Sequence, residues 1–94
     1  MNDLLTCFDS EGVRFAVLFI NESHPSGIGA KSHFNHVIKF AHSLKTFVVD
    51  VNTDAGLEVA DVLNVSKTPQ LRIYEGSTII AQTQDPKQFE SFLR

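Results

Sequence analysis

The order of apolar and polar positions predicts alternating helices and strands in the first half of the chain. Residues 3–8 place apolar side chains three and four positions apart, as a short amphipathic helix does. Residues 14–20 are almost continuously apolar and too short for a typical helix, so they predict a strand covered on both faces. A polar loop over residues 21–31 is expected next, with Ser32 as the N-cap of a second helix. The apolar stripe expected on that helix is Phe34, Val37, Ile38, Ala41 and Leu44.

A second β-branched run over residues 46–51 predicts another strand. A strand–helix–strand crossover of this kind makes the two strands parallel. The connection between them is almost always right-handed. Thr53 or Asp54 is then expected to cap the next helix. The apolar face of that helix is Val59, Ala60, Val62 and Leu63.

The last third of the chain predicts a β-hairpin followed by a helix. After Pro69, Leu71 and Ile73 alternate with Arg72 and Tyr74, which is the period of a strand. A tight turn at residues 75–77 leads to an antiparallel strand over residues 78–83. Asp85 before Pro86 reads as an N-cap followed by Pro at the first helical position, and the buried stripe of this helix is Phe89, Phe92 and Leu93. The predicted order is αβαβαββα in one domain over residues 1–94.

Composition removes several classes of function. The chain has 94 residues, of which 43% are hydrophobic, so it can bury a core without disulfides or a structural metal ion. Its net charge is −3 and it has no basic cluster, so nucleic acid is not an expected partner. The single Cys7 excludes an internal disulfide and a zinc site built on several thiolates, and low Cys usage fits a reducing, cytoplasmic location. Neither a signal peptide nor a membrane-spanning helix is predicted.

The order of elements, with Pro69 opening the third strand, resembles the thioredoxin fold over almost the whole chain. Residues 49–52 look like the second parallel strand of that family, and residues 60–65 look like the end of the following helix. Thr68-Pro69 looks like the family's cis-proline signature, and Tyr74-Glu75-Gly76 looks like its hairpin turn. The resemblance implies an α/β fold of the three-layer α/β/α type, with a four-stranded mixed sheet and a cis bond before Pro69.

The catalytic motif of thioredoxins is missing. That family carries Cys-x-x-Cys after the first of these strands, at a helix N-terminus, which lowers the pKa of a thiol. Here Ser23-His24-Pro25-Ser26 resembles the motif with serine in place of both cysteines. The buried acid that assists proton transfer in the family is also missing, because residues 17–19 are apolar. The resemblance therefore implies a redox-inactive member.

Other chemistry-bearing residues favour ordinary structural roles. Cys7 lies among apolar residues and is expected to be a small buried hydrophobe. To act as a nucleophile, Ser23 or Ser26 would need a general base in hydrogen-bonding position and an acid that orients this base. The sequence around them does not provide this pair. No metal site and no cofactor are predicted, because no Cys, Asp or Glu joins the histidines at ligand spacing. The four histidines are His24, His33, His36 and His42.

The resemblance implies a peptide-binding role for Thr68 and Pro69. In proteins of this fold, the residue before the cis-proline pairs its backbone with an extended peptide or with glutathione, and such pairing is a form of strand addition. We therefore predict a protein-binding module, with an adaptor, chaperone-like or assembly role, that uses this edge and residues 21–31. The predicted binding residues are Ser23, His24, Pro25, Ser26, Ile28, Thr68, Pro69 and Tyr74.

Two alternatives remain open from the sequence. One is a thiol- or glutathione-linked oxidoreductase that uses Cys7 or a partner's thiol, above all if Ser23 and Ser26 replace native cysteines. The other is a structural subunit that assembles through its sheet edge or through a helix face near Phe40. The sequence leaves the oligomeric state open.

Overall fold

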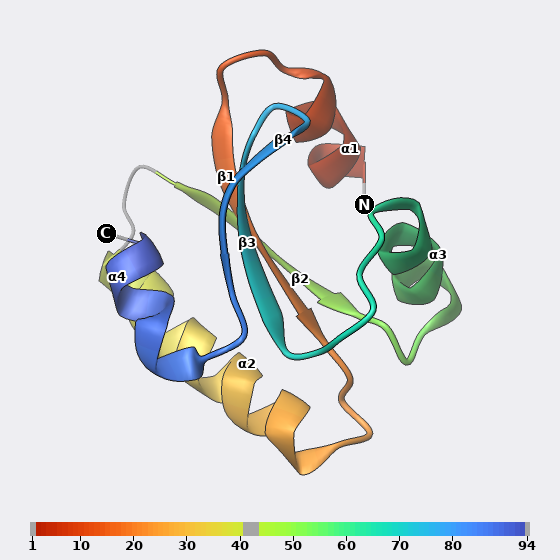
Figure 1. The fold of residues 1–94 in the computed structure, drawn as a ribbon, viewed down its shortest axis with the longest axis vertical. Coiled ribbons are helices and arrows are strands. Elements are labelled where there is room, and N and C mark those ends of the chain that lie inside the picture. Colours follow the sequence, from red (N-terminus) through yellow and green to blue (C-terminus); the bar gives the residue numbers. More distant parts are fainter. Residues whose placement is uncertain (1, 41–43, 94) are drawn as a thin grey trace.

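Helices and strands alternate in the predicted order in the computed structural model, which describes residues 2–40 and 44–93 (Figure 1). The helices are α1 (Asn2–Asp9), α2 (Pro25–Val37), α3 (Asp54–Val62) and α4 (Phe89–Leu93). The strands are β1 (Arg14–Ile20), β2 (Lys45–Asp50), β3 (Gln70–Glu75) and β4 (Thr78–Thr83). Two 3₁₀ helices, Ile38–Phe40 and Pro86–Gln88, follow α2 and precede α4. None of the described helices has the length and apolar character that a membrane span requires.

The four strands form one mixed sheet in the order β2-β1-β3-β4. β1 pairs in parallel with β2 and antiparallel with β3, while β3 and β4 form the antiparallel hairpin. The parallel pairing follows from the crossover through α2, as expected for a strand–helix–strand unit. The predicted three-layer α/β/α arrangement is confirmed, with α1 and α3 on one face and α2 and α4 on the other (Figure 1).

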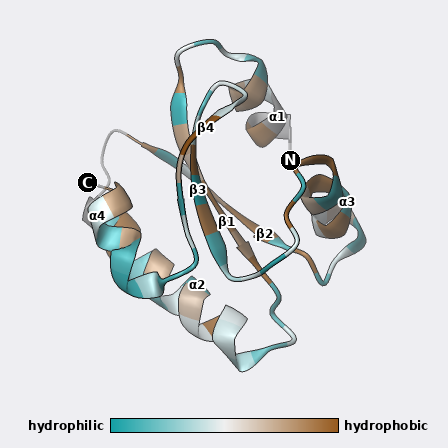
Figure 2. Cartoon of the chain, viewed as in Figure 1, coloured by the Kyte–Doolittle hydropathy of each residue, from teal (hydrophilic) through white to brown (hydrophobic). Residues whose placement is uncertain are grey.

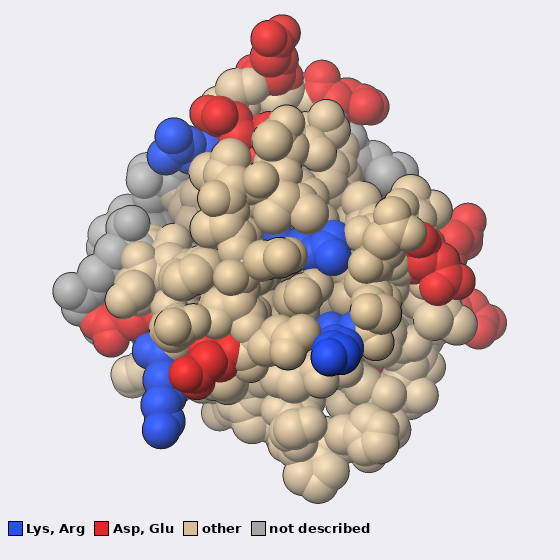
Figure 3. Space-filling model, viewed as in Figure 1, with Lys and Arg blue, Asp and Glu red and all other residues tan. Residues whose placement is uncertain are grey.

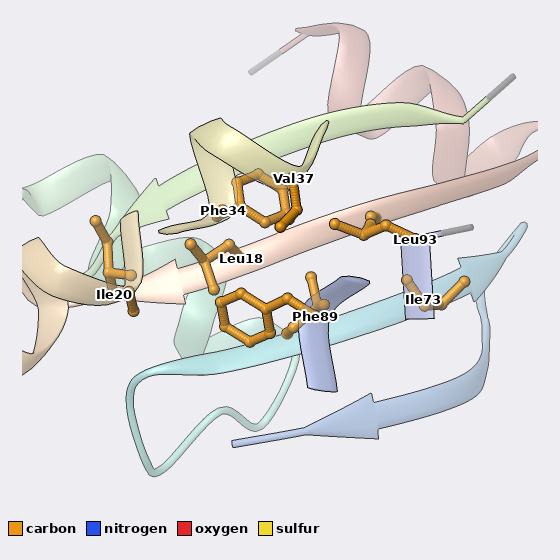
Figure 4. Packing of buried hydrophobic residues seen from close by; sticks show 10 residues of the cluster. Leu18, Ile20, Phe34, Val37, Ile73, Phe89 and Leu93 are labelled. Carbon is orange, nitrogen blue, oxygen red and sulfur yellow. The ribbon is translucent and has the colours of Figure 1, made fainter. Parts of the chain in front are cut away.

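The face under α2 and α4 buries an aliphatic and aromatic cluster (Figure 4). Phe34 and Val37 of α2 meet Phe89 and Leu93 of α4 over the even-numbered residues of β1. The rings of Phe34 and Phe89 contact edge to face, with centroids 6.2 Å apart. Of the stripe predicted for the second helix, Phe34 and Val37 are buried in α2, while Ile38 and Leu44 pack partly against the cluster from beyond the end of this helix and Ala41 lies outside the described residues. In the last helix Phe89 and Leu93 are buried and Phe92 is partly buried, as a periodic apolar stripe predicts.

The opposite face packs aromatic rings beneath α1 and α3. Phe15 of β1 stacks on Tyr74 of β3 with ring centroids 5.3 Å apart, and Phe8 of α1 meets both rings edge to face. Cys7 lies in this cluster with 2% of its surface exposed, as predicted for a small buried hydrophobe. Because helices cover both faces, Arg72 and Tyr74 are buried together with Leu71 and Ile73.

The predicted start of the second helix is wrong. We expected a loop over residues 21–31 and an N-cap at Ser32, but α2 begins at Pro25 and Ser32 lies inside it. Pro at the first helical position costs no hydrogen bond, because the first N–H groups of a helix have no partner within it. The buried stripe of α2 continues from Val37 and Phe34 toward the start of the helix through two small residues, Ala30 and Gly27.

Two glycines allow the helices to approach the ends of the preceding strands. A Cβ atom added at Gly27 would lie 2.1 Å from the carbonyl oxygen of Asn21, and one at Gly56 would lie 1.8 Å from that of Asp50. Real Cβ atoms do not approach a carbonyl oxygen so closely, so both helices need glycine in their first turn. Thr53 caps α3 as predicted, because its side chain accepts a hydrogen bond from Gly56 N.

The two glycines of α2 should respond oppositely to alanine. Gly27→Ala should destabilise the fold by about 1–3 kcal/mol through overpacking. Gly29→Ala is the matched control, because a Cβ there meets nothing within 4 Å, and it should stabilise the helix by about 0.5–1 kcal/mol. Urea unfolding of both variants gives the comparison. Equal effects of the two substitutions would contradict the close approach of α2 to Asn21.

Candidate functional site

Three connections meet at one end of the sheet. The register pairs Phe19 with Gln70 and Ile20 with Asp50. The same end of the sheet therefore holds the segment after β1, the segment after β2 and the segment before β3. Both α2 and α3 begin at this end (Figure 1). This end of the sheet, formed by residues 21–26, 50–54 and 64–69, is called the loop end below.

The segment that leads into α2 is folded on its own polar groups. The backbone N–H of Ser23 donates to Asn21 Oδ1 at 2.9 Å, and the Ser23 hydroxyl bonds the same oxygen. His24 is the N-cap residue of α2, and its backbone N–H donates to the carbonyl of Asn21 at 3.1 Å. Ser23 and Ser26 are exposed. The Ser23 hydroxyl is thus paired with an amide and not with a general base, so this geometry does not activate it as a nucleophile.

Asp50 connects this segment to the end of β2. Its Oδ1 atom accepts the backbone N–H of Asn52 at 2.9 Å and that of Glu22 at 3.2 Å. The hydrogen bond from Asn52 is the main cause of a lowered pKa of Asp50. Burial opposes this lowering, and hydrogen bonds from Glu22 and the charge of Lys31 lower the pKa further. Lys31 of α2 also forms an ion pair with Glu22. Polar contacts therefore hold the start of α2 against the start of the β2–α3 connection.

The segment before β3 has free hydrogen-bonding groups in its backbone. The peptide bond between Thr68 and Pro69 is cis, as predicted, and both residues are half-buried. Regular pairing of β3 with β1 begins at Gln70. Within the described part of the chain, the N–H and C=O groups of Thr68 make no hydrogen bond with another protein atom. They are therefore left to water or to a binding partner.

A buried arginine fixes the path of the chain into this segment. Arg72 is 6% exposed. Its Nη1 donates to the carbonyl of Leu63 at 2.7 Å and to the Tyr74 hydroxyl at 3.0 Å, and its Nη2 donates to the carbonyl of Asn64 at 3.3 Å. The guanidinium also lies 5.6 Å from the centre of the Phe19 ring. Because the last carbonyls of a helix have no partner within it and carry a partial negative charge, Arg72 satisfies the end of α3 and fixes the turn at Asn64.

Comparisons with known proteins show which fold this arrangement has. No family model and no curated protein sequence match the chain. Among solved structures, oxidised thioredoxin O2 from Arabidopsis thaliana matches 97% of this chain and 81% of its own, with a TM-score of 0.82 and 17% identity. The fold is thioredoxin-like. Oxidised Plasmodium falciparum thioredoxin matches 100% of this chain and 93% of its own, with a TM-score of 0.77 and 13% identity. Mitochondrial thioredoxin 3 from Saccharomyces cerevisiae matches 98% of this chain and 86% of its own, with a TM-score of 0.78 and 13% identity.

This thioredoxin-like chain has no Cys-x-x-Cys motif, because Cys7 is its single cysteine. Cys7 belongs to α1 and is buried on one face of the sheet, whereas α2 and α4 cover the other face. No described group of three or more His, Cys, Asp or Glu side chains is arranged to hold a metal ion. His42 lies outside the described residues, as does the side chain of Phe40.

The loop end brings together most of the predicted binding residues. It contains Ser23, His24, Pro25, Ser26, Thr68 and Pro69, and Ile28 follows in the first turn of α2 with 57% of its surface exposed. Tyr74 does not belong there. It pairs with Phe15 near the other end of β1 and is only 1% exposed, because α1 covers it, so no partner reaches its ring in this conformation. Sequence reasoning missed Asp50 and Arg72, whose contacts come from other elements.

Asp50 should make stability depend on pH in acid. A carboxyl group whose pKa is lowered on folding stabilises the native state above its unfolded pKa of about 3.9 and loses this effect as pH falls through the lower folded value. Asp50→Asn should therefore reduce the free energy of unfolding near neutral pH, and the difference from the unmodified chain should shrink below about pH 4. Urea titrations from neutral to acid pH measure it. Asp61→Asn on the exposed side of α3 is the control, and a difference for Asp50→Asn that does not vary with pH would contradict the assignment.

Proposed function

We propose that this chain is a redox-inactive thioredoxin-like module that binds a protein partner at the loop end. The observation that supports the proposal is that the backbone N–H and C=O of Thr68, just before the start of β3, have no hydrogen-bonding partner in the described part of the chain. An extended peptide that pairs with these groups would add to the sheet in the manner of strand addition. The role would be that of an adaptor, a chaperone-like protein or an assembly factor.

Backbone pairing alone would give weak affinity. Each net hydrogen bond is worth about 0.5–1.5 kcal/mol, so two bonds to Thr68 supply only a small part of a stable complex. Exposed side chains at the start of α2 must provide the remainder. Ile28, with 57% of its surface exposed, offers apolar area, and the exposed His24 offers a polar contact.

The similar structures suggest which part of a thioredoxin site this chain would retain. Their names describe thioredoxins, and one describes the thiol-resolving mechanism of a yeast mitochondrial 1-Cys peroxiredoxin through glutathione and thioredoxin systems. Those are properties of those proteins. In this chain Ser23-His24-Pro25-Ser26 resembles the Cys-x-x-Cys motif with serine in place of both cysteines, so thiol exchange at this position would have no nucleophile. What we propose to be shared is recognition of an extended peptide, with glutathione as the less favoured ligand.

Partner capture should depend on Ile28. Ile28→Asp places a charge at the loop end without changing the strands, and it should lower recovery of the bound partner about tenfold or more, as loss of a central apolar contact does. Leu57→Asp is the matched control, because Leu57 is similarly exposed at 50% but lies on α3. Affinity purification from the source cell, with quantitative mass spectrometry and a thermal-unfolding check of both variants, measures the effect. A partner captured equally by folded Ile28→Asp would move the interface elsewhere, with the exposed Ile79 and Ile80 of edge strand β4 as the next candidates.

The chain should not reduce disulfides. In an insulin-reduction assay with a dithiol donor, its rate should equal that of a Cys7→Ser variant, because the only thiol is 2% exposed and has no resolving cysteine. The Ser26→Cys variant is a useful comparison, because it introduces a thiol in the first turn of α2, where the helix dipole lowers thiol pKa. Turnover by the unmodified chain above that of Cys7→Ser would favour the oxidoreductase alternative.

A further inference from the structure

An apolar groove lies between α1 and α3, on the face of the molecule opposite α2 and α4. It has a volume of about 500 Å³. Phe8 of α1 forms one wall, and Val59, Val62 and Leu63 form the other, with Ser77 of the β3–β4 turn at one end. Figure 2 shows strongly hydrophobic colouring on the turn of α3 that lies nearest to α1. A groove of this size accommodates several side chains of a partner.

The walls of the groove expose apolar surface to solvent. Val62 is the most exposed large hydrophobic residue among the described side chains, at 74%. Val59, Leu63 and Phe8 pack only partly against the aromatic cluster below them. Exposed apolar side chains that gather along a concave surface, and are not scattered singly, are typical of an interaction site.

Both helices that border the groove are acidic. α3 carries three acids and α1 ends in Asp9, and neither helix contains Lys or Arg. Glu58 lines the groove itself, and Asp54 and Asp61 belong to the same helix. On the visible face, Figure 3 shows acidic side chains grouped on the side of α3, with no Lys or Arg between them. Charge complementarity at an interface favours a partner of the opposite sign.

We propose that this groove binds a basic amphipathic helix of a partner protein. A helix lying between α1 and α3 would insert apolar side chains spaced i, i+3 or i+4 and i+7 between Phe8 and Val62. Its flanking Lys and Arg residues would meet Glu58 and the other acids of α3. A second copy of this chain is a poor occupant, because an isologous contact would bring the same acidic helices together. The groove is separate from the loop end, so this inference does not rest on the proposed function.

A designed peptide provides a direct test. The probe is a synthetic helical peptide with Leu at i, i+3 or i+4 and i+7 and Lys at the flanking positions, carrying a fluorescent label. A second peptide keeps the Leu stripe and replaces every Lys by Glu. Fluorescence anisotropy at low salt should show that the Lys peptide binds at least about tenfold more tightly than the Glu peptide, and that raising the ionic strength to roughly 0.5 M weakens its binding.

Two substitutions locate the binding surface. Val62→Gln should weaken binding of the Lys peptide about tenfold, the loss expected when an apolar contact of this size is removed. Leu57→Gln is the matched control, since Leu57 is an exposed apolar residue of α3 that does not line the groove, and it should leave binding unchanged. Glu58→Gln should reduce the salt dependence. All three Gln variants replace exposed side chains, and circular dichroism verifies that they fold.

Several results would overturn the inference. One is equal binding of the Lys and Glu peptides, and another is binding of the Lys peptide that Val62→Gln leaves intact. Absence of saturable binding at millimolar peptide would also contradict it. Sedimentation analysis is the remaining test, because a dimer that Val62→Gln dissociates would show that a second copy occupies the groove. Weakening by Ile28→Asp in place of Val62→Gln would move the peptide to the loop end.

Discussion

The burial of residues 15–20 of β1 on both faces of the sheet is the constraint on which this structure depends. Residues 15–20 are all 0% exposed, although a strand presents successive side chains to opposite faces. Ala16, Leu18 and Ile20 enter the cluster beneath α2 and α4, while Phe15, Val17 and Phe19 enter the aromatic cluster beneath α1 and α3. Each large apolar side chain removed from water contributes about 1.5–3 kcal/mol, so helices must cover both faces and strands must pair with both edges. The three layers follow from this one strand.

The polar contacts at the loop end determine how the connections leave that core. Arg72 points from β3 toward the end of α3 and binds the carbonyls of Leu63 and Asn64, which sets the direction of the segment that reaches Thr68. Asp50 binds the backbone of Glu22 and so fixes the residues before α2 to the end of β2. Burial of a guanidinium is costly unless its donors are satisfied, and here helix-end carbonyls, Gln70 and Tyr74 accept them. The unpaired backbone of Thr68 therefore lies in a defined position and not on a loose loop.

Much of the fold could be predicted from local signals, whereas the details of the site could not. The continuous apolar run at residues 14–20, the caps at Thr53 and Asp85, and the hairpin turn at residues 75–77 all act through their own neighbours in sequence. The start of α2 was missed because Gly27 is weakly helical in isolation and is favoured only by its contact with Asn21. Tyr74 was assigned to the binding surface because its burial depends on α1, which lies far away in the sequence. The roles of Asp50 and Arg72 likewise come from tertiary hydrogen bonds.

We propose that this thioredoxin-like scaffold binds an extended peptide at the loop end and has no thiol chemistry there. The most direct test of this proposal is amide hydrogen exchange measured by NMR on the isotopically labelled chain, with and without its purified partner or the partner's bound segment. We predict that the amide of Thr68 exchanges much more slowly in the complex, because its N–H becomes hydrogen-bonded to the added strand. Slowing at the amides of β4 or α3 with no change at Thr68 would contradict the account.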